Sequence, residues 1–182
     1  MKSALIFIIS TLAQLYLLVM LLRFWLPFLR ADFRNPISQG ILKATSPLVI
    51  PLRRIIPSIG RLDTATVVVA FVIQYLTILL VLVILNIAPR IAPVALTAAL
   101  DLLILSLRLF TFAIFIHIIL GWVAPNTHNP ATAFIAMLVE PVLRPVRGLI
   151  PPLGALDLSP LFVIIGFQAV SIFLGEMRPW NI

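Results

Sequence analysis

The sequence contains no cysteine and few charged residues. Its 182 residues are 62% hydrophobic and only 10% charged, whereas a soluble domain carries about 25% charged residues. The lack of cysteine excludes disulfides, iron–sulfur clusters, thiolate zinc sites and thiol nucleophiles. The two histidines, His117 and His128, have no carboxylate at ligand spacing, so we expect no metal and no cofactor. Such a chain cannot cover itself with polar surface, and we expect lipid to be its solvent.

Motifs that carry catalysis are also missing. There is no Walker loop, no Ser–His–Asp order, no pair of carboxylates and no carboxylate at the middle of an apolar run, so we do not expect an enzyme. The formal charge of +7 arises from 13 Lys and Arg against 6 Asp and Glu. Because these basic residues lie beside apolar runs, the expected partners are anionic lipid headgroups and not nucleic acid.

Four stretches are long and apolar enough to cross a bilayer, which takes about 20 residues. They cover roughly residues 4–26, 64–87, 97–123 and 159–177. The first is too long for a signal peptide and no small-residue cleavage site follows it, so we expect it to be retained. The predicted fold class is an all-α integral membrane protein with four transmembrane helices.

Basic residues in the loops predict the orientation, because Lys and Arg accumulate on the cytoplasmic side. The loops after the first and third spans hold eight basic residues: Arg30, Arg34, Lys43, Arg53, Arg54, Arg61, Arg144 and Arg147. The opposite side holds Lys2, Arg90 and Arg178. This bias predicts cytoplasmic loops and periplasmic termini. Trp25, Trp122 and Trp180 fall at span ends, as interfacial tryptophans do.

The chain contains an internal repeat. An offset of 94 residues aligns identical residues at 13 positions without a gap, namely Asn35, Pro36, Ile41, Pro47, Pro51, Arg53, Ile56, Pro57, Gly60, Leu62, Asp63, Val69 and Gln74 with Asn129, Pro130, Ile135, Pro141, Pro145, Arg147, Ile150, Pro151, Gly154, Leu156, Asp157, Val163 and Gln168. Each unit, 1–88 and 94–182, reads span, hairpin, span. We therefore expect two parallel-oriented repeats that form one compact membrane domain.

The hairpins, residues 35–60 and 129–154, carry helix starts and breaks. In the first, Asn35 is a predicted N-cap with Pro36 in the first turn. Ser46–Pro47 and Pro51 predict a break. The remaining signals are a stop at Pro57, a turn at Gly60 and a cap at Asp63, and the second copy repeats them with Asn129, Pro130, Pro141, Pro145, Pro151, Gly154 and Asp157. Each hairpin is thus predicted to be two short helical pieces, interfacial or shallowly re-entrant.

These segments resemble the YggT family, called YlmG in other bacteria and in plastids. The resemblance is carried by "LLRFWLPFLRADFRNPI", "TSPLVIPLRRIIPSIGRLD" and "HNPATAFIAMLVEPVLRPVRGLIPPLGALDLSP" and covers essentially the whole chain. The second copy departs where Arg54 becomes Gly148 and Arg61 becomes Ala155, so it is less basic. The resemblance implies a bacterial inner-membrane protein linked to osmotic-stress tolerance, to cell-division gene neighbourhoods and, in plastids, to cytochrome assembly or nucleoid organisation.

Two sets of polar residues are candidate sites. Arg53, Arg54, Arg144 and Arg147 of the hairpins are predicted to bind lipid headgroups or a partner, although plain snorkelling arginines would look the same. Arg108, Gln74, Gln168 and His117 are the polar residues within spans. They either line a polar pathway or join helices by hydrogen bonds. Arg108 needs a partner, with Gln14, Gln74, Gln168 or a loop carbonyl as candidates.

Three function hypotheses follow. The first is a structural or interaction protein that presents two basic hairpins to anionic lipids or to a membrane complex. The second is an oligomeric channel or small carrier for ions or osmolytes, motivated by Arg108 and the paired glutamines; four spans enclose a pore only as a homo-oligomer. The third is an assembly factor for a membrane complex. We favour the first.

Overall fold

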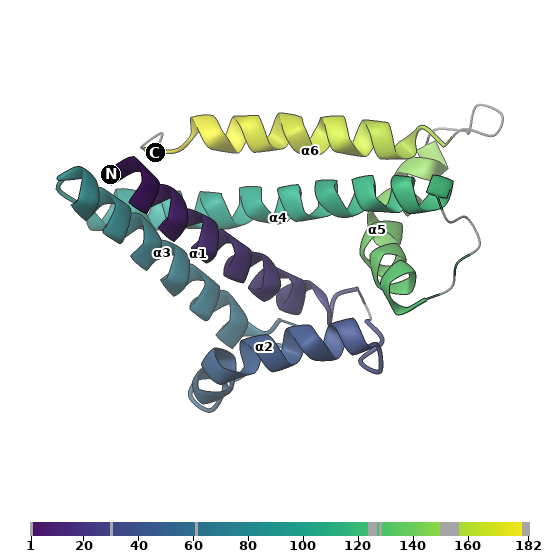
Figure 1. Cartoon of the computed structure of the whole chain (residues 1–182), viewed down its shortest axis with the longest axis horizontal. Helices are drawn as coiled ribbons and strands as arrows, with labels where there is room; N and C mark the ends of the chain where they lie inside the picture. Colours follow the sequence, from purple (N-terminus) through teal and green to yellow (C-terminus); the bar gives the residue numbers. More distant parts are fainter. Residues whose placement is uncertain are drawn as a thin grey trace.

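The computed structural model describes residues 2–29, 31–60, 62–123, 127, 129–149 and 157–179. Over these residues the chain is all-helical and contains no β-strand. The helices are α1 (Lys2–Trp25), α2 (Pro36–Arg53), α3 (Thr64–Leu85), α4 (Ile91–Val123), α5 (Pro130–Leu149) and α6 (Ser159–Glu176). Figure 1 shows the order span, shorter helix, span in each half of the chain.

Four of these helices, α1, α3, α4 and α6, are long and apolar enough to cross a membrane. This confirms the predicted fold class and four apolar spans. Seven of the eight span boundaries agree with the prediction to within two residues, while α4 begins at Ile91, six residues before the predicted start. At 1.5 Å per residue α4 is about 50 Å long, longer than the roughly 30 Å hydrocarbon core. Part of α4 must therefore tilt or emerge from the bilayer.

The spanning helices pack as two pairs. Helix α1 packs mainly against α3, and α4 against α6. In Figure 1 the first pair runs obliquely to the second, and the two pairs diverge toward the end of the molecule that carries α2 and α5. Leu17 and Met20 of α1, Val69 of α3 and Leu105 and Phe110 of α4 are buried in the apolar core between the pairs. Aliphatic side chains also cover much of the outer surface, as expected where lipid is the solvent.

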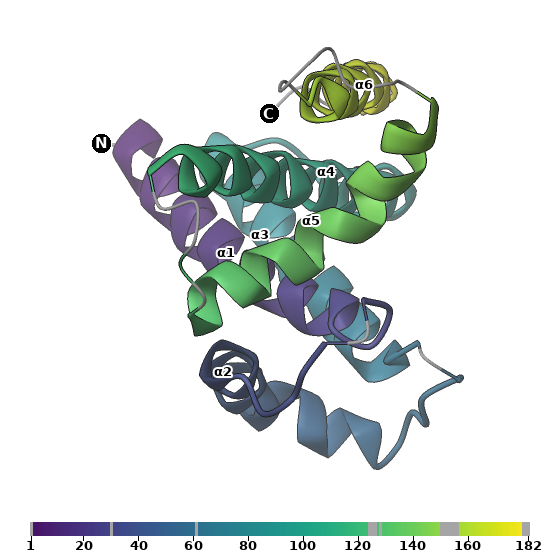
Figure 2. The same cartoon turned by 90° about the vertical axis from the view of Figure 1, so that its right-hand side faces the viewer.

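Helices α2 and α5 lie across the ends of the spans. Figure 2 shows α5 crossing in front of α4, with α2 beside it. In α2 the buried residues recur every three to four positions, at Ser38, Ile41, Thr45 and Val49, so one face packs on the spans. The two helices also meet directly, where Asn35 Nδ2 donates a hydrogen bond to the Pro130 carbonyl at 2.8 Å.

The predicted break inside each hairpin is wrong. Helix α2 continues through Pro47 and Pro51, and α5 continues through Pro141 and Pro145. All four prolines are exposed, so their rings do not interrupt the buried face of either helix. The missing N–H groups cost local hydrogen bonds, which the packed face outweighs.

The predicted helix starts at Asn35 and Asn129 and the turn at Gly60 are confirmed. The predicted cap at Asp63 is wrong, because its side chain makes no capping hydrogen bond with α3. Asn35 caps α2 by accepting from the Ile37 N–H at 2.9 Å. Asn129 accepts from Ala131 and Thr132 at the start of α5. Gly60 has φ +61°, a left-handed conformation that glycine adopts at little cost. Pro151 and Gly154, the matching signals in the second copy, lie outside the described residues.

Candidate membrane-interface site

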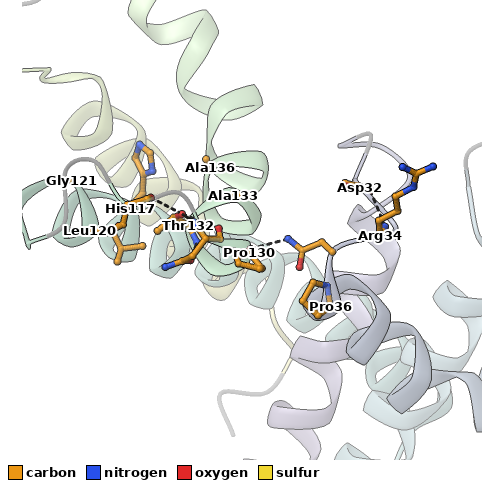
Figure 3. Close-up of a pocket in the computed structure, with 13 residues that line it drawn as sticks. Asp32, Arg34, Pro36, His117, Leu120, Gly121, Pro130, Thr132, Ala133 and Ala136 are labelled. Atoms are coloured by element: carbon orange, nitrogen blue, oxygen red, sulfur yellow. Dashed lines mark hydrogen bonds between the residues drawn. The ribbon is translucent and has the colours of Figure 1, made fainter.

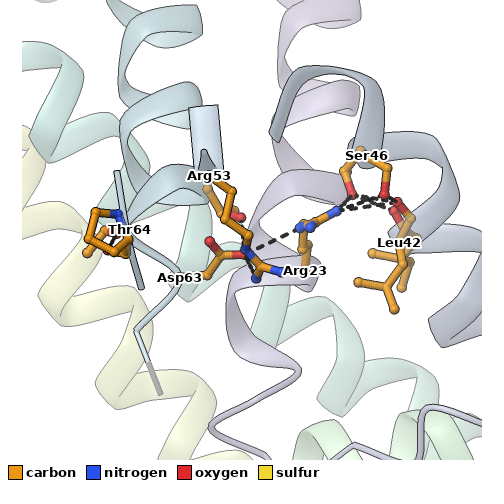
Figure 4. A network of polar contacts seen from close by, with 10 residues as sticks. Arg23, Leu42, Ser46, Arg53, Asp63 and Thr64 are labelled. Carbon is orange, nitrogen blue, oxygen red and sulfur yellow. Dashed lines mark hydrogen bonds and ion pairs between the residues drawn. The ribbon is translucent and has the colours of Figure 1, made fainter. Parts of the chain in front are cut away.

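A cluster of charges lies at the base of the first hairpin (Figure 4). Asp63 Oδ2 accepts hydrogen bonds from Arg53 Nη2 at 2.7 Å and from the Thr66 hydroxyl at 2.8 Å. Arg23 Nε lies 3.5 Å from the same oxygen. Only 5% of the Arg23 and Asp63 side chains is exposed, against 49% for Arg53. Asp63 is the residue before α3, but its side chain makes no capping hydrogen bond. Oδ2 faces these three partners, and Oδ1 is buried without a hydrogen-bond partner among the described residues.

The other end of the Arg23 side chain binds α2. Its Nη1 donates to the Thr45 hydroxyl at 2.8 Å, and to the Leu42 carbonyl at 3.3 Å and the Ser46 hydroxyl at 3.4 Å. Thr45 in turn donates to the Ile41 carbonyl at 2.7 Å. One buried guanidinium therefore connects α1 with α2 and with the residue that opens α3. Its planar set of donors suits it to several acceptors at once.

The electrostatics of this cluster keep Asp63 ionised. Burial alone would raise the pKa of Asp63, but hydrogen bonds from Thr66 and Arg53 and the charges of Arg53 and Arg23 lower the pKa below its usual value. The stabilisation by this carboxylate is therefore present above the pKa of the unfolded chain. It is lost only as the pH falls through the lower pKa of the folded chain.

The second hairpin carries the same arginine and aspartate with the opposite charge balance. Arg147 Nε donates to Asp157 and its Nη1 donates to Glu140, both at 2.7 Å. Glu140 is the repeat equivalent of Ser46 in the first copy. In the first copy one carboxylate lies between two arginines, and the cluster has a net charge of +1. In the second copy one arginine lies between two carboxylates, and the net charge is −1. The second cluster is also more open, with side chains 36–54% exposed.

The structure therefore sorts the four predicted hairpin arginines into two kinds. Arg53 and Arg147 are engaged by carboxylates. Arg54 and Arg144 are exposed, and neither side chain forms a hydrogen bond or ion pair with any residue the structure describes. Lys43 and Arg34 share this state on the same side of the molecule. Among the described residues of the hairpin side, these four cations remain available to an external anion.

The polar residues of the spans lie at separate places. Gln74 donates to Asp101 at 2.7 Å, and Asp101 pairs with Arg178 at 2.6 Å. These three residues border a small cavity of about 160 Å³ near the chain termini, which Gln14 also lines. Gln168 and Arg108 are exposed, on α6 and α4. Neither forms a hydrogen bond or ion pair with another residue among those described.

His117 belongs to a third place, near the hairpins (Figure 3). It lines a cleft of about 640 Å³ together with Asp32, Arg34, Asn35 and Thr132. The cleft lies between the start of α2, the end of α4 and the start of α5. The four predicted polar residues, Arg108, Gln74, Gln168 and His117, are thus not brought together within one chain.

Sequence reasoning missed the residues that hold these clusters together. Arg23, Thr45, Thr66 and Arg178 are not among the predicted site residues. One signal was available for Arg23, because an arginine inside an apolar run demands an anionic partner. Of the six acidic residues, Asp63 alone stands immediately before the span that follows the first hairpin.

These features define a multi-pass helical membrane protein in which the polar clusters at the hairpins and the one near the chain termini are separated by an apolar core. A family model described as CCB3/YggT matches residues 2–84 and again residues 96–178, and the chain belongs to this family. The second match begins and ends 94 residues after the first, which is the offset that aligns the two copies in the sequence.

Relatives from several bacteria match over nearly their full length. An uncharacterized protein of Pseudomonas aeruginosa is 42% identical over 96% of this chain and 89% of its own. A protein from the region 3' of proC in Vibrio alginolyticus is 41% identical over 94% of this chain and 93% of its own. YggT of Escherichia coli K12 is 31% identical over 96% and 91%. No solved structure matches the chain.

Proposed function

We propose that this protein is a non-enzymatic membrane-interface protein, whose helices α2 and α5 lie at the cytoplasmic surface of the bacterial inner membrane and bind anionic lipid headgroups. One observation carries the proposal: exposed cations without protein partners stand beside exposed aliphatic side chains on both hairpins. A role in membrane organisation follows from such a surface. The osmotic-stress role that the family resemblance implies would act through the same surface.

The arrangement of the two residue types fits an interfacial depth. Arg54 is followed by Ile55, which is 81% exposed, and α2 also exposes Leu48 and Ile50. On α5, Leu149 lies five residues after Arg144 and is 82% exposed. Aliphatic groups gain by entering the acyl boundary, while each basic residue near an anionic surface contributes about 1 kcal/mol.

The separation of the polar clusters favours this role over a conduit through a single chain. The Arg23–Asp63 cluster lies at the hairpin end of α3, and Gln74, which pairs with Asp101, lies eleven residues after Asp63 along the same helix. Leu17, Leu21, Ala70 and Leu109 fill the core between them. An ion crossing there would lose its hydration without gaining ligands. Arg108 faces outward, so any pathway through it would need other copies of the chain.

A lipid-preference measurement tests the proposal. We expect the reconstituted protein to bind spin-labelled phosphatidylglycerol more strongly than spin-labelled phosphatidylcholine, measured as the motionally restricted fraction by electron paramagnetic resonance. Arg54→Gln and Arg144→Gln should each lower this preference by up to about fivefold, because about 1 kcal/mol per residue is lost. Raising the salt concentration should weaken the preference of the wild type as well.

Arg90→Gln is the matched control. Arg90 is an exposed arginine at the opposite end of the spans, so its replacement changes the net charge equally without touching the hairpins. We expect a smaller effect from it. No preference for phosphatidylglycerol in the wild type, or an equal loss in all three variants, would contradict the proposal.

A further inference from the structure

The two helix pairs leave a cleft between them that the packing of the chain does not fill. Its volume is about 740 Å³, and it runs from Pro141 of α5 down to Leu174 of α6, with walls from α1, α3 and α4. It exists because the pairs diverge toward the hairpins (Figure 1), with α5 crossing its wide end (Figure 2). Val67, Leu103 and Val170 on its walls are 39–54% exposed, so the cleft opens toward lipid.

The size of the cleft decides between a helix and a smaller occupant. A spanning helix about 10 Å wide and about 30 Å long would need roughly three times this volume. The cleft is instead within the range of about 300–1,000 Å³ that small-molecule pockets occupy. Its walls are almost entirely aliphatic and aromatic, with Phe110 and Phe167 among them. A single hydrocarbon chain is the occupant that such a shape and chemistry fit.

Polar groups are found at the hairpin end of the cleft. The ring of Trp25 lines the cleft there, and tryptophan rings are enriched at the headgroup level of bilayers. Arg144 is three residues beyond Pro141, so it lies on the same face of α5, and it is exposed without an ion pair to any described residue. It would supply a cation for a phosphate group.

We propose that the cleft binds one anionic glycerophospholipid, with an acyl chain between the helix pairs and against the Trp25 ring, and with the phosphate at Arg144. This inference deepens the proposed function and rests on it, because it names one site where the hairpin surface holds a specific lipid. General attraction of headgroups to the hairpin surface would leave lipids in rapid exchange. A lipid held in the hydrocarbon cleft should instead exchange slowly.

Quantifying the lipid that stays with the purified protein tests this inference. The protein is reconstituted in vesicles of phosphatidylethanolamine and phosphatidylglycerol, extracted in mild detergent, washed until bulk lipid is gone, and analysed by native mass spectrometry. We expect about one phosphatidylglycerol to remain per wild-type chain. Val67→Trp combined with Val170→Trp should fill the cleft and abolish retention. Arg144→Gln should reduce it several-fold.

Controls separate the cleft from its surroundings. Val83→Trp places the same side chain on a part of α3 that is 62% exposed and does not line the cleft, and it should leave retention unchanged. The thermal unfolding midpoint of each variant shows whether it still folds. Unchanged retention in a folded, filled variant would overturn the inference, as would retention of a zwitterionic or isoprenoid lipid or of none.

The same variants distinguish this inference from the proposed function. The filled variant should keep the phosphatidylglycerol preference of the hairpin surface. If that preference depends on Arg54 and Arg144 while no lipid is retained by the wild type, only the cleft proposal fails. If the preference is absent as well, the proposed function fails with it.

Discussion

Replacing Asp63 by Asn is expected to lower the free energy of unfolding by about 3–5 kcal/mol, the cost of removing one partner from a buried ion pair. The substitution keeps the shape of the side chain and removes its charge. It leaves the guanidinium of Arg23, only 5% exposed, next to Arg53 without a counter-charge. Equilibrium unfolding in mixed detergent and dodecyl sulfate micelles, followed by circular dichroism, measures the loss.

The internal repeat supplies the matched control. Asp157 occupies the equivalent position in the second copy, but 38% of its side chain is exposed. Exposed ion pairs are worth about 0–1 kcal/mol, so Asp157→Asn should cost no more than that. Adding Arg23→Met to Asp63→Asn should restore part of the stability, because the unpaired charge is then gone. Equal losses of unfolding free energy for Asp63→Asn and Asp157→Asn would contradict the prediction that burial makes the first ion pair the more stabilising one.

The second large effect is expected at Asp101. Asp101→Leu should lower the free energy of unfolding by about 2–3 kcal/mol, because hydrogen bonds to charged groups contribute about 1.5–3 kcal/mol and unpaired buried groups add a penalty. The substitution leaves Gln74, which is 9% exposed, and Arg178 without their shared acceptor. The same unfolding assay measures it.

Gln74 and Gln168 form the control pair for this prediction. Gln74→Leu removes one interhelical hydrogen bond and should cost about 0.6–2 kcal/mol. Gln168→Leu changes an exposed residue at the repeat-equivalent position and should stay within about 0.5 kcal/mol. In Gln74→Leu combined with Asp101→Leu the losses should not add, since both remove the same bond. Additive losses would place the two residues in separate interactions.

The spans could be predicted because their signals are local. A long apolar run bounded by polar residues is sufficient to identify a spanning helix, and Asp63–Thr64 marks the start of α3 to the residue. The start of α4 was placed too late because Ile91–Leu96, although apolar, follows Pro89 and contains Pro93. Proline is tolerated in a first helical turn, and α4 uses it there.

The hairpins show where local signals fail. Pro47 and Pro51 predict a break, but the sequence alone does not show that both rings face outward while Ile41, Thr45 and Val49 keep one continuous buried face. Tertiary packing then overrides the local cost of proline. The direction in which a proline faces depends on the helix register against the spans, which exists only in the fold.

The choice of polar partners also depends on the fold. Arg53 and Asp63 form an ion pair, and their repeat equivalents Arg147 and Asp157 form another. This repeated pair could have been predicted from the sequence. Arg23 reaches Thr45 only because α2 folds back over α1. Arg108 and Gln74 both lie in spans, but Arg108 is exposed and Gln74 is buried against Asp101. No periodicity in the sequence indicates this difference.

The most direct test of the central claim is the depth of α2 and α5 in the bilayer. The chain has no cysteine, so Ala44→Cys on α2, Ala131→Cys on α5 and Leu76→Cys within α3 each accept a single spin label. All three positions are exposed. The contrast between relaxation by oxygen and by a water-soluble nickel complex should place the two hairpin labels at headgroup depth and the α3 label in the hydrocarbon core. Hairpin labels as accessible to nickel as a label in bulk water would contradict the account.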